Sequence, residues 1–270
     1  MGKNRWFLPV VSTLGFLFLY APIVSLVIFS FNANRLVTVW SGFSLQSYTD
    51  LWKDPQLLPA AWLSLQIAAV AASIALVLGT LCAVALVRFR RFRGKTVLQA
   101  TVSAPLVMPD VITGLALLLL FVAMQSVIGW PAGRGIVTII IAHATFCTAY
   151  VTVVVQSRLI DMDHSIEEAA MDLGATPVRV FFDITLPVIA PALVSGWLLA
   201  FTLSLDDLVI ASFVSGPGSS TLPMIIFSKV RLGVSPEVNA LATIIIGVVA
   251  LAVVIASVIG FSSSGRTRKA

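Results

Sequence analysis

Three aspartates lie inside long apolar stretches of the sequence, and they are the side chains there most able to do chemistry. Asp110 follows a proline, and Asp206 and Asp207 stand side by side in a later apolar stretch. A carboxylate at the centre of a bilayer costs at least ~2.5 kcal/mol, so such groups usually face the interior of a helix bundle or a watery cavity. Negative charge held in that position attracts cations. The three aspartates therefore predict a path for a cationic solute.

Helical spacing separates the two adjacent aspartates. Ser195, Thr202 and Asp206 are seven and four residues apart, so they share one face of a continuous helix. On that helix Asp207 points about 100° away, toward Ser204. We expect Asp206 to face the path and Asp207 to serve helix packing. A packing hydrogen bond between helices is the alternative for each of the three aspartates, and the sequence leaves it open.

Aromatic side chains in the same region could contribute to the path. A ring face attracts an ammonium group by ~0.5–2 kcal/mol, although packing is the more common role of aromatic residues in membrane spans. The candidate pathway residues are therefore Asp110, Trp197, Thr202, Asp206, Asp207 and Phe213.

No catalytic or metal-binding site is predicted. Gly94-Lys95-Thr96 ends like a phosphate-binding loop, but Phe89 stands where that loop needs a glycine, and no strand precedes it. His143 is expected to form a hydrogen bond between helices and His164 to lie in a loop, neither as a metal ligand. A Gly-x-Ser-x-Gly elbow is absent from the sequence. We therefore expect no enzyme, and any ATP must be hydrolysed by another chain.

The elements that position these residues are predicted to be membrane helices. Hydrophobic residues make up 59% of the chain and charged residues 11%, against roughly 25% charged residues in soluble domains. Backbone groups in lipid need internal partners, so an apolar run of about 20 residues must be helical. Six such runs lie at about 8–31, 60–87, 97–125, 135–157, 188–213 and 238–261. The fold class is thus all-α, a polytopic membrane protein with about six transmembrane helices in one domain, residues 1–270.

Prolines and turn residues refine this outline. Pro105 and Pro109 should kink or break the third run, because each lacks a backbone donor. Residues 32–59 are expected to form a small cap or short helix outside the spans. Residues 215–221 form a turn cluster, and 222–231 are too short to cross the membrane.

The distribution of Lys and Arg predicts the orientation. Twelve of the seventeen lie at the two termini, in the 88–95 loop and in the 158–187 loop. The positive-inside rule therefore places both termini and these two loops in the cytoplasm. The basic cluster at 88–95 is expected to act as an anchor near anionic lipid rather than as a specific partner site. The net charge of +5 gives no argument for nucleic-acid binding.

The 158–187 loop contains a helix–turn–helix pattern. Ser165 and Glu168 have the spacing of a capping box that opens a helix, and Gly174 is placed to end it. Thr176 followed by Pro177 then starts a second helix. Capping signals alone would also fit an ordinary pair of surface helices.

The full spacing of this loop resembles the cytoplasmic EAA loop of ABC importer permeases. Glu168-Ala169-Ala170 is followed by Gly174 and then by Ile184-Thr185-Leu186-Pro187. In that family the first short helix docks on an ATPase subunit and carries its closure to the membrane domain. The resemblance implies that the ATPase-coupling residues are Glu167, Glu168, Ala169, Ala170, Gly174 and Pro187.

Further segments resemble the polyamine (putrescine or spermidine) branch of that family. They are Phe18–Pro22, Ser30–Asn32, Ala104–Asp110, Thr202–Asp207, Phe213–Pro217 and Pro236–Ala242. The resemblance implies the type I ABC importer permease fold and transport by alternating access from the periplasm to the cytoplasm. An ion-coupled secondary transporter of organic cations, in which Asp206 or Asp207 carries a proton, is the alternative. Putrescine and spermidine make the same local demands on a carboxylate, so the sequence does not distinguish between these two substrates.

The resemblance also implies a set of partners. They are a second, unlike permease subunit, two ATPase subunits that hold ATP and Mg, and a periplasmic polyamine-binding protein. The complex would lie in a bacterial inner membrane, with the lipid bilayer around it and no cofactor on this chain.

Overall fold

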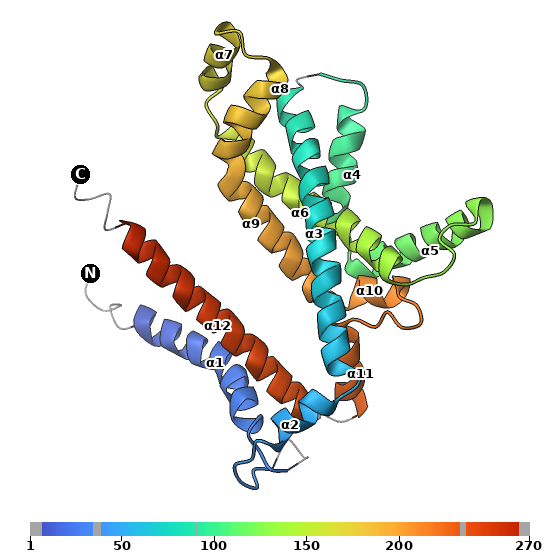
Figure 1. Cartoon of the computed structure of the whole chain (residues 1–270), viewed down its shortest axis with the longest axis vertical. Helices are drawn as coiled ribbons and strands as arrows, with labels where there is room; N and C mark the ends of the chain where they lie inside the picture. The colour runs from blue at the N-terminus through green and yellow to red at the C-terminus, as the bar shows by residue number, and fades with distance from the viewer. Residues whose placement is uncertain (1–6, 35–38, 90, 233–235, 265–270) are drawn as a thin grey trace. The chain divides into compact units, whose positions relative to one another are not determined.

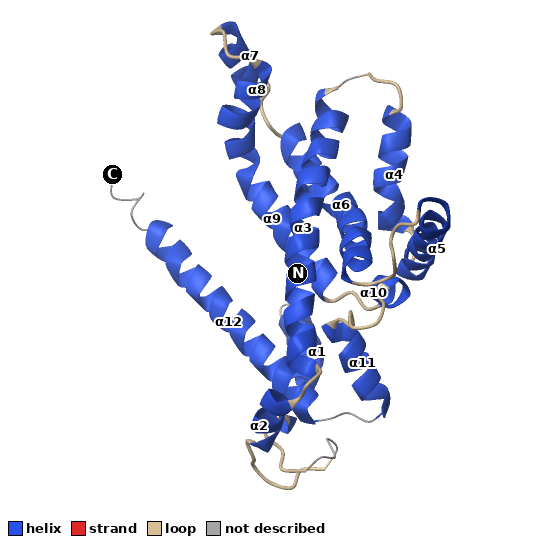
Figure 2. Cartoon of the chain, turned by 45° about the vertical axis from the view of Figure 1, so that its right-hand side comes forward, coloured by secondary structure: helices blue, strands red, loops and turns tan. Residues whose placement is uncertain are grey.

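The computed structural model describes residues 7–34, 39–89, 91–232 and 236–264 (Figure 1). All named elements of secondary structure among these residues are helices (Figure 2). The first six helices are α1 (Phe7–Phe29), α2 (Gln46–Lys53), α3 (Leu57–Arg88), α4 (Lys95–Val107), α5 (Asp110–Ile128) and α6 (Ile136–Ile160). The later elements are α7 (Ser165–Asp172), α8 (Pro177–Val180), the π-helix η1 (Phe181–Thr185), α9 (Leu186–Leu205), α10 (Val209–Val214), α11 (Leu222–Leu232) and α12 (Pro236–Ser264). The predicted all-α class is confirmed.

Five helical segments among the described residues are long and apolar enough to cross a membrane. They are α1, α3, α5, α6 and the continuous segment Pro177–Leu205. The sixth predicted run, 238–261, falls within α12, whose first part up to Leu251 is a shorter apolar helix by the same criterion. About six membrane helices are therefore present, as expected.

The third predicted run, 97–125, is broken where its prolines indicated. Met108 adopts an extended conformation (φ −76°, ψ 137°) between the end of α4 and Pro109. A residue before proline avoids the helical region because the proline ring clashes with its backbone and side chain. The helix restarts at Asp110, while Pro105 is accommodated inside α4. The break places Asp110 at the N-terminus of α5.

The fifth predicted run, 188–213, is not one helix, so the prediction of a continuous span there is wrong. α9 ends at Leu205, with Asp206 as its C-terminal cap, and α10 begins only at Val209. The cause is Asp207, whose carboxylate accepts the backbone N–H groups of Ile210 and Ala211 at 3.2 and 2.7 Å. An aspartate side chain that binds nearby N–H groups competes with helix hydrogen bonds and favours a fresh helix start.

The chain divides into two compact units, one of residues 59–225 and one of residues 1–58 with 226–270. In the first of these, buried side chains of α3, α6, α9 and α10 form a shared core. Small residues let the helices approach closely: a Cβ added at Gly79 of α3 would lie 2.7 Å from the Cβ of Val151 on α6. Close backbone approach over small residues is a common way to pack helices in membranes.

In the other unit α12 packs against α1 and α2. α2 is the short helix expected between the first two spans, and Asp54 at its C-terminal cap accepts a hydrogen bond from Lys229 on α11 at 2.5 Å. Burial disfavours ionisation of Asp54, but hydrogen bonds from Lys229, Leu57 and Gln56 outweigh this and hold the pKa of Asp54 below its usual value. The ion pair therefore ties α11 to the end of α2.

Candidate functional site

The loop between α6 and α9 contains the two predicted short helices, α7 and α8 (Figure 1). The start of α7 differs from the prediction, because Ser165 is its first residue and His164 its cap, with no side-chain capping bond. The carboxylate of Asp163 instead accepts the N–H of Ser165 at 2.9 Å. Hydrogen bonds from the Ser165 backbone and hydroxyl hold the pKa of Asp163 below its usual value. The predicted capping box is therefore wrong, and an aspartate two residues earlier takes its place.

The end of α7 is confirmed at Gly174. This residue has a φ of +89°, a conformation that glycine adopts without the strain of a Cβ. Its N–H donates to the carbonyl of Met171 at 2.9 Å, and the N–H of Ala175 donates to the carbonyl of Ala170 at 3.1 Å. These two bonds form a Schellman motif. Ala169 is exposed and Ala170 half-buried on the same short helix.

The second short helix begins as predicted at Thr176 and Pro177. Thr176 is extended, and its hydroxyl accepts the N–H of Arg179 at 3.4 Å. Pro177 occupies the first helical position, where a missing N–H is not needed for a hydrogen bond. Arg179 also forms an exposed ion pair with Asp183 at 3.1 Å.

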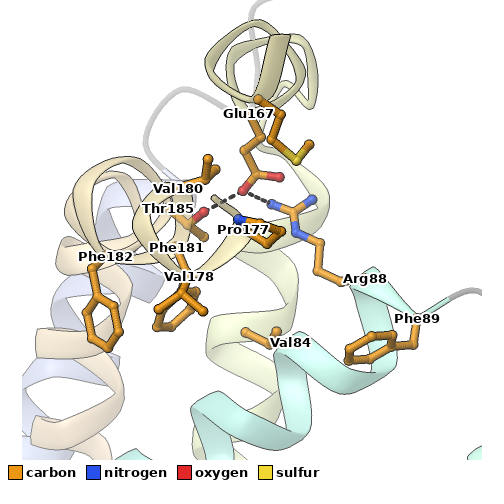
Figure 3. Close-up of a pocket in the computed structure, with 11 residues that line it drawn as sticks. Val84, Arg88, Phe89, Glu167, Pro177, Val178, Val180, Phe181, Phe182 and Thr185 are labelled. Carbon is orange, nitrogen blue, oxygen red and sulfur yellow. Dashed lines mark hydrogen bonds and ion pairs between the residues drawn. The ribbon is translucent and has the colours of Figure 1, made fainter. Parts of the chain in front are cut away.

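The two glutamates of α7 have opposite surroundings. Glu168 is exposed, and the described contacts give its side chain no ion pair or hydrogen bond. Glu167 is buried, and its Oε1 accepts both Arg88 Nη2 at 2.6 Å and Thr185 Oγ1 at 2.5 Å (Figure 3). A ring nitrogen of His164 lies 3.7 Å from Glu167 Oε2. The structure thus brings one candidate coupling residue inside the loop and leaves the other on its surface.

An apolar cavity of about 510 Å³ lies beside this network. Val84 and Phe89 line it from the end of α3 and the residue after it, and Val178 and Phe181 line it from the opposite side (Figure 3). The local sequence places Arg88 only in the basic cluster and gives no sign that Thr185 neighbours Glu167. Arg88 and Thr185 lie 79 and 18 residues from Glu167 in the sequence, so no local sequence pattern indicates that they contact it.

Pro187 shapes the segment that follows α8. In a regular helix its missing N–H would leave the carbonyl of Asp183 without its usual partner. The backbone instead forms the π-helix η1, in which the N–H of Leu186 donates to the carbonyl of Phe181. Single π turns inside α-helices are frequent at functional sites. Thr185, the last residue of η1, is the one whose hydroxyl reaches Glu167.

The break after α9 is held by a buried histidine. His143 of α6 is 1% exposed, and its Nδ1 lies 2.7 Å from Ser204 Oγ while its Nε2 lies 3.1 Å from Asp207 Oδ2. One imidazole therefore connects residues on both sides of Asp206. This confirms the expected helix-packing hydrogen bonds of His143.

The three predicted aspartates gather at two helix breaks. Asp110 begins α5, and Asp206 and Asp207 lie between α9 and α10, which itself packs against α5. Asp206 interacts electrostatically with both Asp207 and Asp110. Asp110 and Asp206 are exposed in the single chain, whereas the Asp207 side chain is 8% exposed. Of the three acids, Asp110 and Asp206 are thus the accessible ones in the single chain.

The other candidate pathway residues have separate partners. The indole N–H of Trp197 donates to Ser73 Oγ at 3.1 Å, and its ring stacks on Phe201 at 5.2 Å. Thr202 donates its hydroxyl to carbonyls of its own helix. Phe213 packs against Gly114, where an added Cβ would lie 2.7 Å from its ring. None of these described contacts joins the three residues to a carboxylate.

Comparison with known proteins decides the family. The model of the "binding-protein-dependent transport system inner membrane component" family matches residues 75–265, well over half of the chain and including the loop and both helix breaks. The chain belongs to this family. It is therefore an inner-membrane component of a transport system rather than an enzyme, and the family favours the importer over the ion-coupled alternative.

Relatives of known sequence agree with this assignment. The chain is 65% identical over 242 residues to the putrescine transport system permease protein PotI of Escherichia coli (strain K12), covering 90% of this chain and 86% of that protein. It is 46% identical over 240 residues to the spermidine/putrescine transport system permease protein PotC of Haemophilus influenzae, covering 89% and 90%.

Solved structures share the fold. A bacterial ABC transporter involved in the import of the acidic polysaccharide alginate matches with a TM-score of 0.70 at 17% identity, covering 96% of this chain and 97% of that chain. The MetNI methionine ABC transporter in an inward-facing conformation matches with a TM-score of 0.62 at 17% identity, covering 77% and 94%. The family thus has the predicted ABC importer permease fold.

Proposed function

We propose that this chain is the permease subunit of an ATP-driven importer of polyamines, with putrescine as the first candidate substrate and spermidine as the second. The substrate passes from the periplasm to the cytoplasm by alternating access. The names of the two relatives described above support this substrate class, because one is a putrescine permease and the other a spermidine/putrescine permease.

The observation that carries the proposal is the grouping of three carboxylates at two helix breaks. A helix break at membrane depth is tolerated where the backbone is buried in protein or lines a water-filled cavity. Asp110 and Asp206 both lie at helix breaks, and Asp206 interacts electrostatically with Asp110. Two carboxylates brought together repel one another, so a diammonium ligand that neutralises both is bound more favourably than a neutral solute.

The exposure of these two acids supports a shared pathway. Asp110, Asp206, Ser195 and Thr202 are all exposed in the single chain. Exposed carboxylates in lipid would be costly, and a second, unlike permease subunit that covers this face would enclose them. Trp197 and Phe213, both half-buried, are further candidates to contact the substrate once that partner is in place.

The loop after α6 is the proposed site of ATPase docking. Glu168, Ala169 and Ala170 lie on α7, which Gly174 ends sharply, and Pro187 shapes the connection to α9. Two ATPase subunits that hold ATP and Mg would bind this loop from the cytoplasm. A periplasmic polyamine-binding protein would deliver the substrate on the opposite side. Both chain termini then lie in the cytoplasm.

Reconstitution tests this function directly. The complete complex in proteoliposomes, with its binding protein, should take up putrescine or spermidine only when ATP is present on the cytoplasmic side. Competition with a series of diamines, triamines and monoamines then ranks the substrates. Uptake driven by an ion gradient without ATP would contradict the proposal and favour a secondary transporter. Absence of polyamine uptake with full ATP hydrolysis would contradict the substrate class.

A further inference from the structure

The buried carboxylate of Glu167 joins three separate elements of the chain. Arg88 is the last residue of α3, Glu167 lies in the first turn of α7, and Thr185 is the last residue of η1. Both hydrogen bonds end on the same oxygen, Oε1, at 2.6 and 2.5 Å (Figure 3). The first short helix of the loop is therefore tied to the ends of two spans at a single point.

These bonds are strong for their position. Glu167 is 8% exposed as a residue, and the side chain of Arg88 is 17% exposed. Charge-assisted hydrogen bonds are roughly twice as strong as neutral ones. Arg88 Nη1 also lies 2.5 and 2.9 Å from the ring nitrogens of His164, which holds the guanidinium beside Glu167. A displacement of α7 would have to break these bonds or carry α3 and η1 with it.

The register of Thr185 depends on the π turn. η1 adds one residue to the turn that leads into α9, because in a regular α turn the ring of Pro187 would clash with the carbonyl of Asp183. Thr185 lies two residues before this proline and directs its hydroxyl toward Glu167 (Figure 3). The proline of the loop thus sets the geometry in which α9 is linked to α7.

We propose that Glu167 is an internal strut of the coupling loop, meaning a rigid link that holds α7 to α3 and to the start of α9. Arg88 and Thr185 are the positioning residues of this link. In this arrangement Glu168 stays available to a docked ATPase, while Glu167 transmits the movement of α7 to α3 and to α9. The proposal rests on the proposed ATP-driven function and deepens it, because it assigns the two adjacent glutamates to opposite tasks.

The test compares variants in the complete reconstituted complex and measures substrate molecules moved per ATP hydrolysed. Glu167→Gln removes the charge, and Thr185→Val removes the hydroxyl at nearly constant size. In assembled complexes both should lower this ratio by about fivefold or more, the lower end of ordinary allosteric coupling. Thr185→Ser keeps the hydroxyl donor and should give the same number of substrate molecules moved per ATP hydrolysed as the unaltered complex. Asp183→Asn, which removes a charge from the exposed pair with Arg179 on the same loop, is the matched control and should leave it unchanged.

A second measurement needs no transported substrate. Spin labels on cysteines placed at the exposed residues Phe89 and Asp172 report the distance from the end of α3 to α7. This distance should keep one narrow distribution with and without ATP in the otherwise unaltered complex. In Glu167→Gln it should broaden when ATP is added. If Glu167→Gln assembles poorly, the comparison of Thr185→Val with Thr185→Ser decides the question.

The outcomes separate the two proposals. An unaltered complex that moves no polyamine contradicts the proposed substrate, and the spin-label distances still test the strut. A different result contradicts the strut alone. In it the unaltered complex transports polyamine, and Thr185→Val and Glu167→Gln change neither the number of substrate molecules moved per ATP hydrolysed nor the distribution of spin-label distances.

Discussion

At the scale of single residues, Asp206 and Asp207 are neighbours with different surroundings. Asp206 is exposed and caps the end of α9 through its backbone N–H. Asp207 binds His143 and two backbone N–H groups at the start of α10. The helix break, rather than a rotation of 100° along one helix, separates their environments. Asp206 remains exposed in the single chain, whereas Asp207 is engaged by the protein itself.

Replacement of each acid by asparagine should distinguish these roles. Asp206→Asn removes charge at nearly constant size, so uptake should fall by about tenfold or more, equivalent to ~1.4 kcal/mol, with complex assembly retained. Asp207→Asn should lower complex yield and thermal stability instead, since hydrogen bonds to charged groups contribute roughly 1.5–3 kcal/mol. Uptake is measured per assembled complex. The reverse pattern would place Asp207 in the pathway and Asp206 in the packing.

The ion pair between Asp54 and Lys229 predicts a dependence of stability on pH. The pKa of Asp54 is lowered in the folded chain, so its stabilisation is present above the unfolded value of about 3.9 and is lost as the pH falls through the folded value. Asp54→Asn should lower the melting temperature in detergent at pH 7, and the two proteins should converge only as the pH falls through the folded pKa of Asp54, which lies below about 3.9. Asp50→Asn, on α2, is the control. Equal melting temperatures of Asp54→Asn and the unaltered protein at pH 7 would show that the pair contributes nothing.

At the scale of elements, the sharp end of α7 is a local feature with an expected effect on coupling. Gly174 has a φ of +89° and open space around the position of a Cβ, so a larger side chain meets backbone strain rather than a steric clash. Gly174→Leu should leave membrane insertion intact and abolish stimulation of the partner ATPase. Gly218→Leu is a matched control, because Gly218 also has a positive φ of +74° and open space but lies outside the loop.

ATPase activity of the reconstituted complexes, with and without the binding protein, measures the effect. Full ATP-driven uptake by Gly174→Leu would argue against a docking role of α7. Equal loss in Gly174→Leu and Gly218→Leu would indicate general backbone strain instead.

Local signals in the sequence predicted those elements that depend on local chemistry. Gly174, Thr176 with Pro177, and Pro109 each act through their own backbone geometry, and each ends or begins a helix where expected. The break at Asp206 was missed because apolar periodicity continues across it, while an aspartate side chain captures the N–H groups that follow.

The candidate sites were predicted only in part for a different reason. The three aspartates stand out in an apolar sequence, but their partner His143 is 64 residues away from Asp207. Similarly, Arg88 carries the same charge as its neighbours in the 88–95 cluster, and only the folded chain shows that it pairs with Glu167. Contacts between distant segments have no signature in local spacing.

At the scale of the whole molecule, the distribution of basic residues predicts which loops face the cytoplasm. Ser41 is exposed in the segment between α1 and α2, and Thr96 is exposed in the first turn of α4. An impermeant thiol reagent added to intact cells should label a cysteine at Ser41 and spare one at Thr96. Thr96 is chosen rather than the nearby Gly94 of the 88–95 loop, because Gly94 has a φ of +90°, which a cysteine would strain. Permeabilised cells provide the control, in which both are labelled. If only Thr96→Cys were labelled in intact cells, the predicted orientation would be the reverse of the true one.

The unit that contains α1 and α12 is built from two distant chain segments, and this affects how it can form during biosynthesis. It joins residues 1–58 to residues 226–270, whereas the other unit is formed by the uninterrupted segment 59–225. Chains emerge from the ribosome N-terminal end first, and folding follows that order where contacts allow it. α1 packs against α12, so this packing can form only after α12 has been synthesised. A nascent chain arrested before α12 should therefore contain a folded middle and an α1 that is still open to quality-control proteases.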